Sequence, residues 1–399
     1  MNARTKRFAK VVPGHALVRS GLWQRSLHMW AERRTVIILT YHRVIEKWDR
    51  TLDYSQPGMV VTASTFDRHV AFLKEHFEIV TLDALLGDGY TAERTTRPGC
   101  IITFDDGWRD NYDLAFPILR RHDIPATIYL ATDFIGTNRV SIQTELVYLL
   151  TNANLAALSD ERAPRVYPGP VHRQLKRLAR LGGAVSAQDL DPLIEAMQVA
   201  YGDPVLLREF VHSLASAAGL PTPLAPSRPF FLDWDQVRTM AAAGIEIGSH
   251  TCSHRMMTRL PEDQARDELI RSKTEIERRI GCRVNHFAFP HDDANGPLVV
   301  AAAEAGYRTA SVGGDLSGQE PSAIRCLRRL GMHEAVSGDG RSFSKALLHQ
   351  WLFRAPKEPI TVCSATKIPT VPEEAHETRS SRREGQGLKA ARCEGGGAP

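Results

Sequence analysis

The sequence predicts an α/β fold in which parallel strands are joined by helices and one helical segment is inserted. Short apolar runs alternate with segments whose apolar residues recur at helical spacing, which is the pattern of parallel strands with crossover helices. The alternation stops between residues 137 and 229, where helix-like segments follow one another without a strand. With 399 residues, 43% of them hydrophobic and 24% charged, the chain can form one large core, which excludes a fibrous or wholly disordered protein.

Apolar runs bounded by turn residues are the predicted strands. Between them, Ser64 is placed to cap a helix, and Asp233 with Gln236 has the spacing of a capping box at the start of another. Gly281 and Gly306 mark the ends of two further helices. The predicted strands are residues 36–41, 100–104, 126–130, 245–249, 286–289, 307–312 and 324–330.

The α/β domain is expected to be discontinuous, with other segments around and within it. The final segment has no aromatic residue and is rich in Pro, Glu, Arg, Ser and Gly, so no packed core is expected there. The expected parts are a basic N-terminal arm (1–35), the α/β domain (36–136 and 230–334), the helical insertion (137–229), a terminal helix (335–354) and a disordered tail (355–399).

Charge and hydropathy limit the partners. A net charge of +4 without a basic stripe gives no reason to expect nucleic acid, and no run of 18 apolar residues predicts a transmembrane helix. The first 34 residues are basic and lack the apolar segment of a signal peptide, so they form a solvated arm, a membrane-surface helix or a transit peptide. The six scattered cysteines are interpreted as thiols. We expect a cytoplasmic protein with possible peripheral contact at the inner membrane.

Two adjacent carboxylates follow one predicted strand directly. Residues 101–107 run from an apolar strand into Asp105, Asp106 and Gly107. Neighbouring side chains of a strand face opposite sides, so both carboxylates serve one site only if the strand ends there, which Gly107 permits. The carboxyl ends of parallel strands are where such folds place their sites. The alternative is that the two carboxylates begin a turn and cap the next helix.

Two histidines four residues apart follow another strand. His250 and His254 would share one face of a helical turn, a spacing that allows two imidazoles to bind one metal ion. Together with an aspartate they form a usual ligand set for Zn²⁺, and also the triad of non-haem iron enzymes. Cys252 between them is either a soft ligand or a small buried residue. The alternative without a functional role is a pair of surface histidines.

Two more histidines lie at strand ends. Residues 286–289 form a short strand that stops at Pro290, and His291 comes next, where it either lines a pocket or belongs to a loop. His42 follows the strand at residues 36–41 in the same way. These residues are candidates for contact with a substrate.

The segments at residues 103–107, 250–254 and 287–290, in that order, resemble the NodB-type polysaccharide deacetylases, carbohydrate esterase family four. The resemblance spans about residues 36 to 333. It implies an incomplete (β/α) barrel, with Asp105 as the catalytic base and Asp106, His250 and His254 as ligands of a divalent ion, Zn²⁺ or else Co²⁺ or another ion. The candidate substrate-contacting residues are His42, Phe289, Pro290 and His291.

The chain departs from the family pattern around Pro290. Many relatives carry an arginine before this proline and an aromatic residue after it, whereas this chain has Phe289 before it and His291 after it. The charge partner of Asp105 must then come from elsewhere, and Arg329 is the candidate. The usual segment that supplies the general acid is absent, and His333 is the nearest substitute.

The resemblance implies a metal-dependent hydrolase that removes N-acetyl groups from a polysaccharide, oligosaccharide or lipid-linked sugar containing N-acetylglucosamine, similar to chitooligosaccharide deacetylases. The partner is then a carbohydrate substrate. The alternatives are an O-acetyl glycan esterase, which would use the same metal and base, and a catalytically silent carbohydrate-binding module. The oligomeric state cannot be inferred from the sequence.

Overall fold

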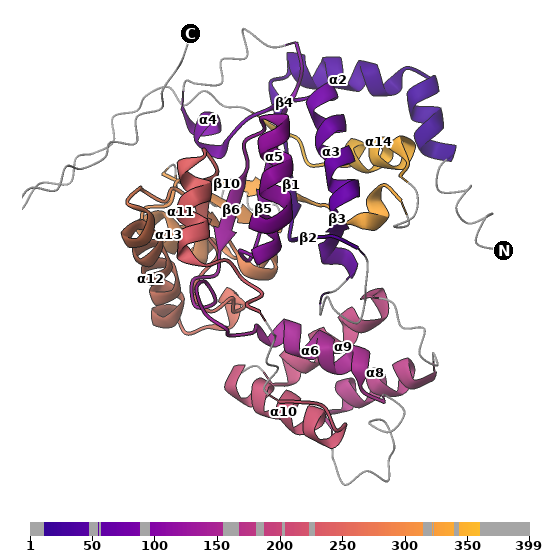
Figure 1. Cartoon of the computed structure of the whole chain (residues 1–399). Helices are drawn as coiled ribbons and strands as arrows, with labels where there is room; N and C mark the ends of the chain where they lie inside the picture. The colour runs from indigo at the N-terminus through magenta and orange to yellow at the C-terminus, as the bar shows by residue number, and fades with distance from the viewer. Residues whose placement is uncertain are drawn as a thin grey trace, which may run out of the picture. The chain divides into compact units, whose positions relative to one another are not determined.

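A computed structural model gives the fold of the chain (Figure 1). It describes residues 12–47, 55, 57–87, 96–154, 167–180, 187–201, 204–222, 228–313, 321, 323–338 and 343–359. Everything said below refers to these residues.

A parallel sheet forms the centre of the fold. Its strands follow the order β10-β9-β8-β7-β6-β5-β1-β11, and every neighbouring pair on this path is parallel. The seven predicted strand regions are confirmed, with small shifts at their ends. The bounds are β1 Thr35–Tyr41, β5 Gly99–Phe104, β6 Thr127–Leu130, β7 Glu246–Ser249, β8 His286–Ala288, β9 Thr309–Val312, β10 Arg325–Arg328 and β11 Leu330–Gly331.

The two edges of this sheet are joined by one short stretch of chain. β10 pairs with β9 at one edge, and β11 pairs with β1 at the other, in the register Leu330 opposite Leu39. Only Arg329 separates β10 from β11. The sheet is therefore nearly closed into a barrel, the (β/α) architecture expected from the sequence.

Four shorter strands were not predicted. β4 (Glu78–Ile79) pairs with β5, and β12 (Glu358–Pro359) pairs antiparallel with β1. β2 (Arg43–Ile45) and β3 (Val60–Thr62) form a separate parallel pair. Strands of two or three residues carry too little hydrophobic pattern to be read from sequence.

Helices surround the sheet (Figure 1). The capping box at Asp233 and Gln236 and the left-handed glycine at Gly281 are confirmed as helix ends. The predicted cap at Ser64 is wrong: α3 begins at Ala63, and the Thr62 side chain accepts from the backbone N–H of Thr65. The bounds are α3 Ala63–His76, α4 Leu82–Leu86, α5 Phe116–His122, α11 Trp234–Ala242, α12 Glu262–Ile280, α13 Gly296–Glu304 and α14 Lys345–Phe353.

The basic N-terminal segment is not wholly a solvated arm. α2 (Leu22–Glu32) buries Trp23, Leu27 and Trp30 in the main core, while its basic residues remain at the surface. Three bulky apolar side chains on one helix face are enough to hold that helix against the domain. Residues 1–11 of the predicted arm lie outside the described residues.

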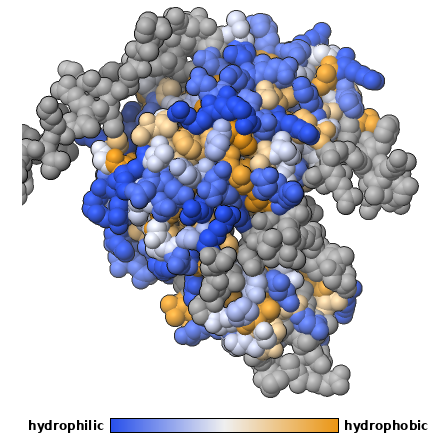
Figure 2. Space-filling view, viewed as in Figure 1, coloured by the Kyte–Doolittle hydropathy of each residue, from blue (hydrophilic) through white to orange (hydrophobic). Residues whose placement is uncertain are grey.

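The insertion folds around a core of its own. Its helices are α6 (Ile142–Asn152), α8 (Gly169–Arg180), α9 (Ala187–Ala200) and α10 (Pro204–Ala217), in agreement with the run of helix-like segments expected between residues 137 and 229. Their apolar faces form a cluster separate from the main core. Figure 2 shows hydrophobic patches on a largely hydrophilic surface in this part. Its exposed aliphatic residues include Val199, Val205 and Leu206.

The disordered tail was predicted to begin at residue 355, but ordered structure continues beyond that residue. Ala355 is buried, and the backbone at Glu358 pairs with β1. The remainder of that tail lies outside the described residues. Among the helices that the structure describes, none is both long and apolar enough to cross a membrane.

Candidate active site

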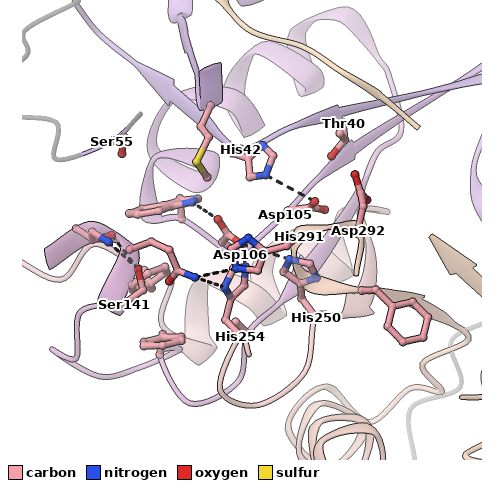
Figure 3. Close-up of a pocket in the computed structure, with 18 of the residues that line it drawn as sticks. Thr40, His42, Ser55, Asp105, Asp106, Ser141, His250, His254, His291 and Asp292 are labelled. Atoms are coloured by element: carbon pink, nitrogen blue, oxygen red, sulfur yellow. Dashed lines mark hydrogen bonds and ion pairs between the residues drawn. The ribbon is translucent and has the colours of Figure 1, made fainter. Parts of the chain in front are cut away.

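The carboxyl ends of β1, β5, β7 and β8 open into one cavity of about 420 Å³ (Figure 3). Each of these strands is followed by a side chain that lines it: His42, Asp105, His250 and Phe289 respectively. Parallel strands end at the same edge of a sheet, so residues far apart in sequence meet there. Other lining residues are Asp106, Trp108, Gln143, His254, His291, Asp292 and Arg329.

The chain turns sharply after β5, so that Asp105 and Asp106 both reach the cavity. Asp106 has φ 72° and Gly107 has φ 76°, both in the left-handed region. A Cβ atom on Gly107 would lie 2.8 Å from the side chains of Leu130 and Ile135, so only glycine fits. The turn breaks the alternation of a strand and brings adjacent carboxylates to one site.

Asp105 is held by a buried arginine. Arg329 Nη1 donates to Asp105 Oδ1 at 2.6 Å, and Nη2 donates to Oδ2 at 2.8 Å. Arg329 Nη1 also donates to Thr40 Oγ1 at 3.2 Å, which fixes the guanidinium plane. Burial acts to raise the pKa of Asp105, but the charge and hydrogen bonds of Arg329, together with His250 and His42, outweigh burial and lower that pKa below its usual value. Asp105 is therefore a carboxylate at neutral pH.

Asp106 faces two imidazoles. The distance from Asp106 Oδ1 is 3.0 Å to His254 Nε2 and 3.4 Å to His250 Nε2, and the potential ligand atoms of the three residues lie within 4.8 Å of one another. Trp108 Nε1 donates to Asp106 Oδ2 at 2.8 Å, which leaves the buried Oδ1 without a hydrogen-bond partner. Burial acts to raise the pKa of Asp106, but His254 and His250 hold it well below its usual value.

The ring of His250 is oriented by the backbone. Its Nδ1 lies 2.7 Å from the carbonyl oxygen of Ala288, so Nδ1 carries the hydrogen and Nε2 presents a lone pair toward Asp106. An orphaned carboxylate oxygen beside this lone pair and that of His254 fits a divalent cation. Asp106, His250 and His254 are therefore the candidate metal ligands.

The two histidines do not share a helical turn, contrary to the sequence-based expectation. Residues 250–254 form a loop in which Thr251 and His254 have positive φ of 68° and 58°. The Thr251 hydroxyl accepts from the backbone N–H of His254 at 2.9 Å, which closes the loop. Cys252 is buried and lies outside the candidate metal cluster.

A second acidic group lies at the opposite ends of the strands. Asp83, Glu246 and His286 also bring three potential ligand atoms together. Here both oxygens of Glu246 accept from the backbone N–H groups of Leu82 and Asp83 at 2.9 Å. This group therefore caps α4 and ties the lower ends of two strands together, and its carboxylate is not vacant for a ligand.

The predicted substrate-contacting residues are partly brought together. His42, Phe289 and His291 line the cavity, whereas Pro290 is buried and is not among the described lining residues. His42 Nε2 lies 3.8 Å from Asp105 Oδ2. His333 is not at the cavity, and its ring lies 5.9 Å from that of Trp351.

The sequence reasoning missed Gln143. This residue lies on α6 of the insertion, and its Nε2 is 2.9 Å from His291 Nε2 and 3.4 Å from His254 Nδ1. It therefore joins the insertion to the metal cluster. No local pattern marks it, because the contact is made across 111 residues to His254.

The chain resembles known proteins in sequence and in structure. A stretch of 115 residues, 27% of this chain, is 31% identical to the poly-beta-1,6-N-acetyl-D-glucosamine N-deacetylase of Staphylococcus epidermidis, and it spans 39% of that relative's length. The Streptococcus pyogenes deacetylase PplD in complex with acetate is 15% identical, with a TM-score of 0.47, over 79% of this chain and 97% of that one. IcaB from Ammonifex degensii is 14% identical, with a TM-score of 0.46, over 80% and 97%.

The fold and the site define a class of protein: a nearly closed parallel α/β barrel whose strand ends carry an ion-paired carboxylate beside an Asp–His–His cluster. The family model for polysaccharide deacetylases matches residues 92–185 and 199–310, which is more than half of the chain. The chain therefore belongs to the polysaccharide deacetylase family.

Proposed function

We propose that this protein is a metal-dependent N-deacetylase that hydrolyses the acetamide of N-acetylglucosamine units in a glycan, an oligosaccharide or a lipid-linked sugar. The observation that carries the proposal is the position of Asp105, an ionised carboxylate held by Arg329 directly beside the Asp106–His250–His254 cluster. A protein that only bound carbohydrate would have no use for a buried base next to a metal site.

A divalent ion, Zn²⁺ or Co²⁺, fits the donor set of Asp106, His250 and His254. The buried, unpartnered Oδ1 of Asp106 supports this assignment, because such an oxygen is costly to bury without a cation or a donor. When bound, the ion acts as a Lewis acid that lowers the pKa of water and polarises the acetyl carbonyl.

Asp105 acts as the general base in this proposal. Each of its oxygens accepts one N–H from Arg329 and keeps a second lone pair for the proton of the attacking water. Arg329 touches Asp105 rather than the substrate, so we assign it as a positioning residue. Its two parallel hydrogen bonds fix the carboxylate plane, which is what proton abstraction at a defined point requires.

The amide N–H of His291 is our candidate donor to the developing oxyanion. Of the three residues at 289–291, Phe289 donates its N–H to Ser311 at 3.1 Å, and Pro290 has none. The His291 amide is thus the remaining backbone donor at this edge of the cavity. Desolvation of its imidazole in the cavity and the neighbouring His254 lower the pKa of the His291 side chain to about 3.

His42 replaces His333 as the proposed general acid for the leaving amine. It lines the cavity, and its Nε2 lies 3.8 Å from Asp105 Oδ2, so a proton taken up by the carboxylate has an imidazole within reach. His333 lies away from the lining residues against Trp351 and does not contact the cavity.

The test is acetate release from N-acetylated chitooligosaccharides and from poly-β-1,6-N-acetylglucosamine, with intact, chelated and Zn²⁺- or Co²⁺-restored protein. We expect release that the chelator stops and the ion restores. His250→Ala should lose the bound ion, whereas the matched Asp83→Asn variant in the second acidic group should keep it. Acetate released from O-acetylated xylan alone would make the protein an esterase, and no release with no bound ion would overturn the proposal.

A further inference from the structure

A second cavity of about 350 Å³ adjoins the catalytic cavity. The two share a wall formed by Phe134, Gln143, His254, Met256 and His291. The insertion supplies Gln143 to this wall, and its amide nitrogen lies within hydrogen-bond distance of His254 and His291. A glycan bound with one sugar in the catalytic cavity therefore has a neighbouring hollow for an adjoining group.

This second cavity is lined by arginines from separate parts of the chain. Arg139 precedes the insertion helices, Arg208 lies on α10, and Arg255 and Arg259 follow the metal-binding loop. Glu209 is the one acidic residue among the described residues that line it. Four guanidinium groups that reach one hollow from three segments create a positive potential there.

Two of these arginines already have carboxylate partners. Arg208 Nη1 is 3.1 Å from the buried Glu145, and Arg139 Nη1 is 3.5 Å from Asp133. The charges of Arg208 and Arg139 are therefore already balanced by Glu145 and Asp133.

Arg255 and Arg259 are different. Arg255 donates to the neutral side chain of Gln264 at 3.3 Å, and neither residue has an ion pair with any described carboxylate. Arg255 is partly exposed and Arg259 is exposed, and both side chains line the hollow. Their charges are therefore available to a ligand with negatively charged oxygens, for which the guanidinium fork is well suited.

We propose that the second cavity binds an anionic oxygen group, a phosphate or a carboxylate, on the sugar that adjoins the N-acetylglucosamine unit undergoing hydrolysis. This inference rests on the proposed deacetylase function and narrows its substrate class to glycans that carry negative charge. Arg255 and Arg259 are the specificity-determining residues. Arg208 and Arg139 contribute to the field while remaining paired with Glu145 and Asp133.

Affinity is the direct test, measured by calorimetry on chelated full-length protein so that no turnover interferes. The probes are neutral N-acetylchitotetraose, the carboxylate-bearing tetrasaccharide of hyaluronan, and N-acetylchitobiose 1-phosphate. We expect at least one anionic probe to bind about tenfold more tightly than the neutral one, the size of one charge-assisted contact, and to weaken as salt is raised. Preference for the phosphate or for the carboxylate identifies the source of the anion.

The double variant Arg255→Gln/Arg259→Gln should remove most of this preference. Arg278→Gln, which changes an arginine on the exposed face of α12 outside both cavities, should leave the preference as in the native protein. Equal affinities for neutral and anionic probes, or an anionic preference that survives the double variant, would overturn the inference. Because binding is measured without turnover, failure of acetate release would count against the proposed function alone.

Discussion

Arg329 and Asp105 are 224 residues apart in sequence, yet both carboxylate oxygens of Asp105 are bonded to the two Nη atoms of Arg329. Both side chains are almost fully buried. Burying such a pair is favourable only when the geometry is good and the remaining hydrogen-bonding groups are satisfied. Thr40 meets part of that requirement by accepting a third hydrogen bond from the guanidinium.

Replacing Arg329 should reduce turnover far more than substrate binding. In Arg329→Met we expect kcat to fall about 100-fold, the typical effect of a misplaced catalytic group, with little change in KM. Arg329→Lys keeps the charge but not the two parallel hydrogen bonds, so it should recover only part of the rate. Added guanidinium ion should partly restore Arg329→Ala. An unchanged kcat in Arg329→Met would show that Asp105 needs no partner.

Asp105→Asn should abolish proton abstraction while the ion stays bound. We expect kcat to fall by about 10² to 10⁴, the usual contribution of a general base. The bound metal, measured by elemental analysis of dialysed protein, should remain at the native level, because Asp105 is outside the Asp106–His250–His254 cluster. Native-like turnover in this variant would transfer the role of base to another residue.

Gln143 should tune metal affinity from the insertion. If His254 held the ion through Nε2, its Nδ1 would carry a hydrogen and need an acceptor, which the Gln143 amide would supply once its oxygen faced the ring. Gln143→Leu should raise the dissociation constant for Zn²⁺ about 10- to 100-fold in competition with a chelating dye.

The Gln143 prediction has two controls. Gln143→Glu keeps an acceptor at the same place and should retain native affinity or exceed it. Gln174→Leu, on α8 of the same insertion, changes a glutamine that bonds with Arg177 and does not line either cavity, and it should have no effect. Native affinity in Gln143→Leu would mean that the insertion does not orient the ligand.

Stability should fall in mild acid because of His69. This residue is fully buried between Tyr41 and Ser337, and burial lowers the pKa of its imidazole from 6.5 to about 3. The unfolded chain therefore binds the proton first as the pH falls below 6.5, and the folded state loses about 1.4 kcal/mol per pH unit from this group. The contribution is fully present above pH 6.5.

Chemical denaturation at pH 7.0, 6.0 and 5.0 tests the role of His69. His69→Gln keeps polar atoms between Tyr41 and Ser337 but does not titrate, so its free energy of unfolding should decline less steeply with falling pH. Parallel declines for the two proteins would show that His69 becomes protonated without unfolding.

The end of the described chain should matter for stability. A protein ending at Arg354 loses the pairing of β12 with β1 and the bond from Arg328 to Glu358 at 3.0 Å. We expect its free energy of unfolding to fall by about 1 to 3 kcal/mol. A protein ending at Ile360 keeps these contacts and should melt at the native temperature. Equal melting temperatures for the two truncations would show that β12 adds nothing.

The strands and the residues at their ends were predictable because each depends on local pattern. An apolar run that stops at a carboxylate or an imidazole identifies both the strand and its functional end, as at Asp105 and His250. The left-handed residues Asp106 and His254 were not predictable in the same way, because non-glycine residues at positive φ leave no compositional trace.

The positions of residues that depend on tertiary packing could not be predicted from the sequence either. His333 follows β11 closely in sequence, but the direction of the chain beyond a strand is set by tertiary packing, here against Trp351. The contact of Gln143 with His291 likewise depends on how an inserted domain meets the barrel. Spacing within the sequence carries no information on either arrangement.

Arg329, the single residue between β10 and β11, is synthesised after the other residues of the candidate site. Asp105, Asp106, His250 and His254 are all synthesised before residue 255, and Arg329 follows them much later in the chain. The partner of Asp105 arrives only with Arg329, in the stretch that joins the two open edges of the sheet. In the proposed mechanism, hydrolysis therefore requires the closed barrel, because only closure brings Arg329 to Asp105.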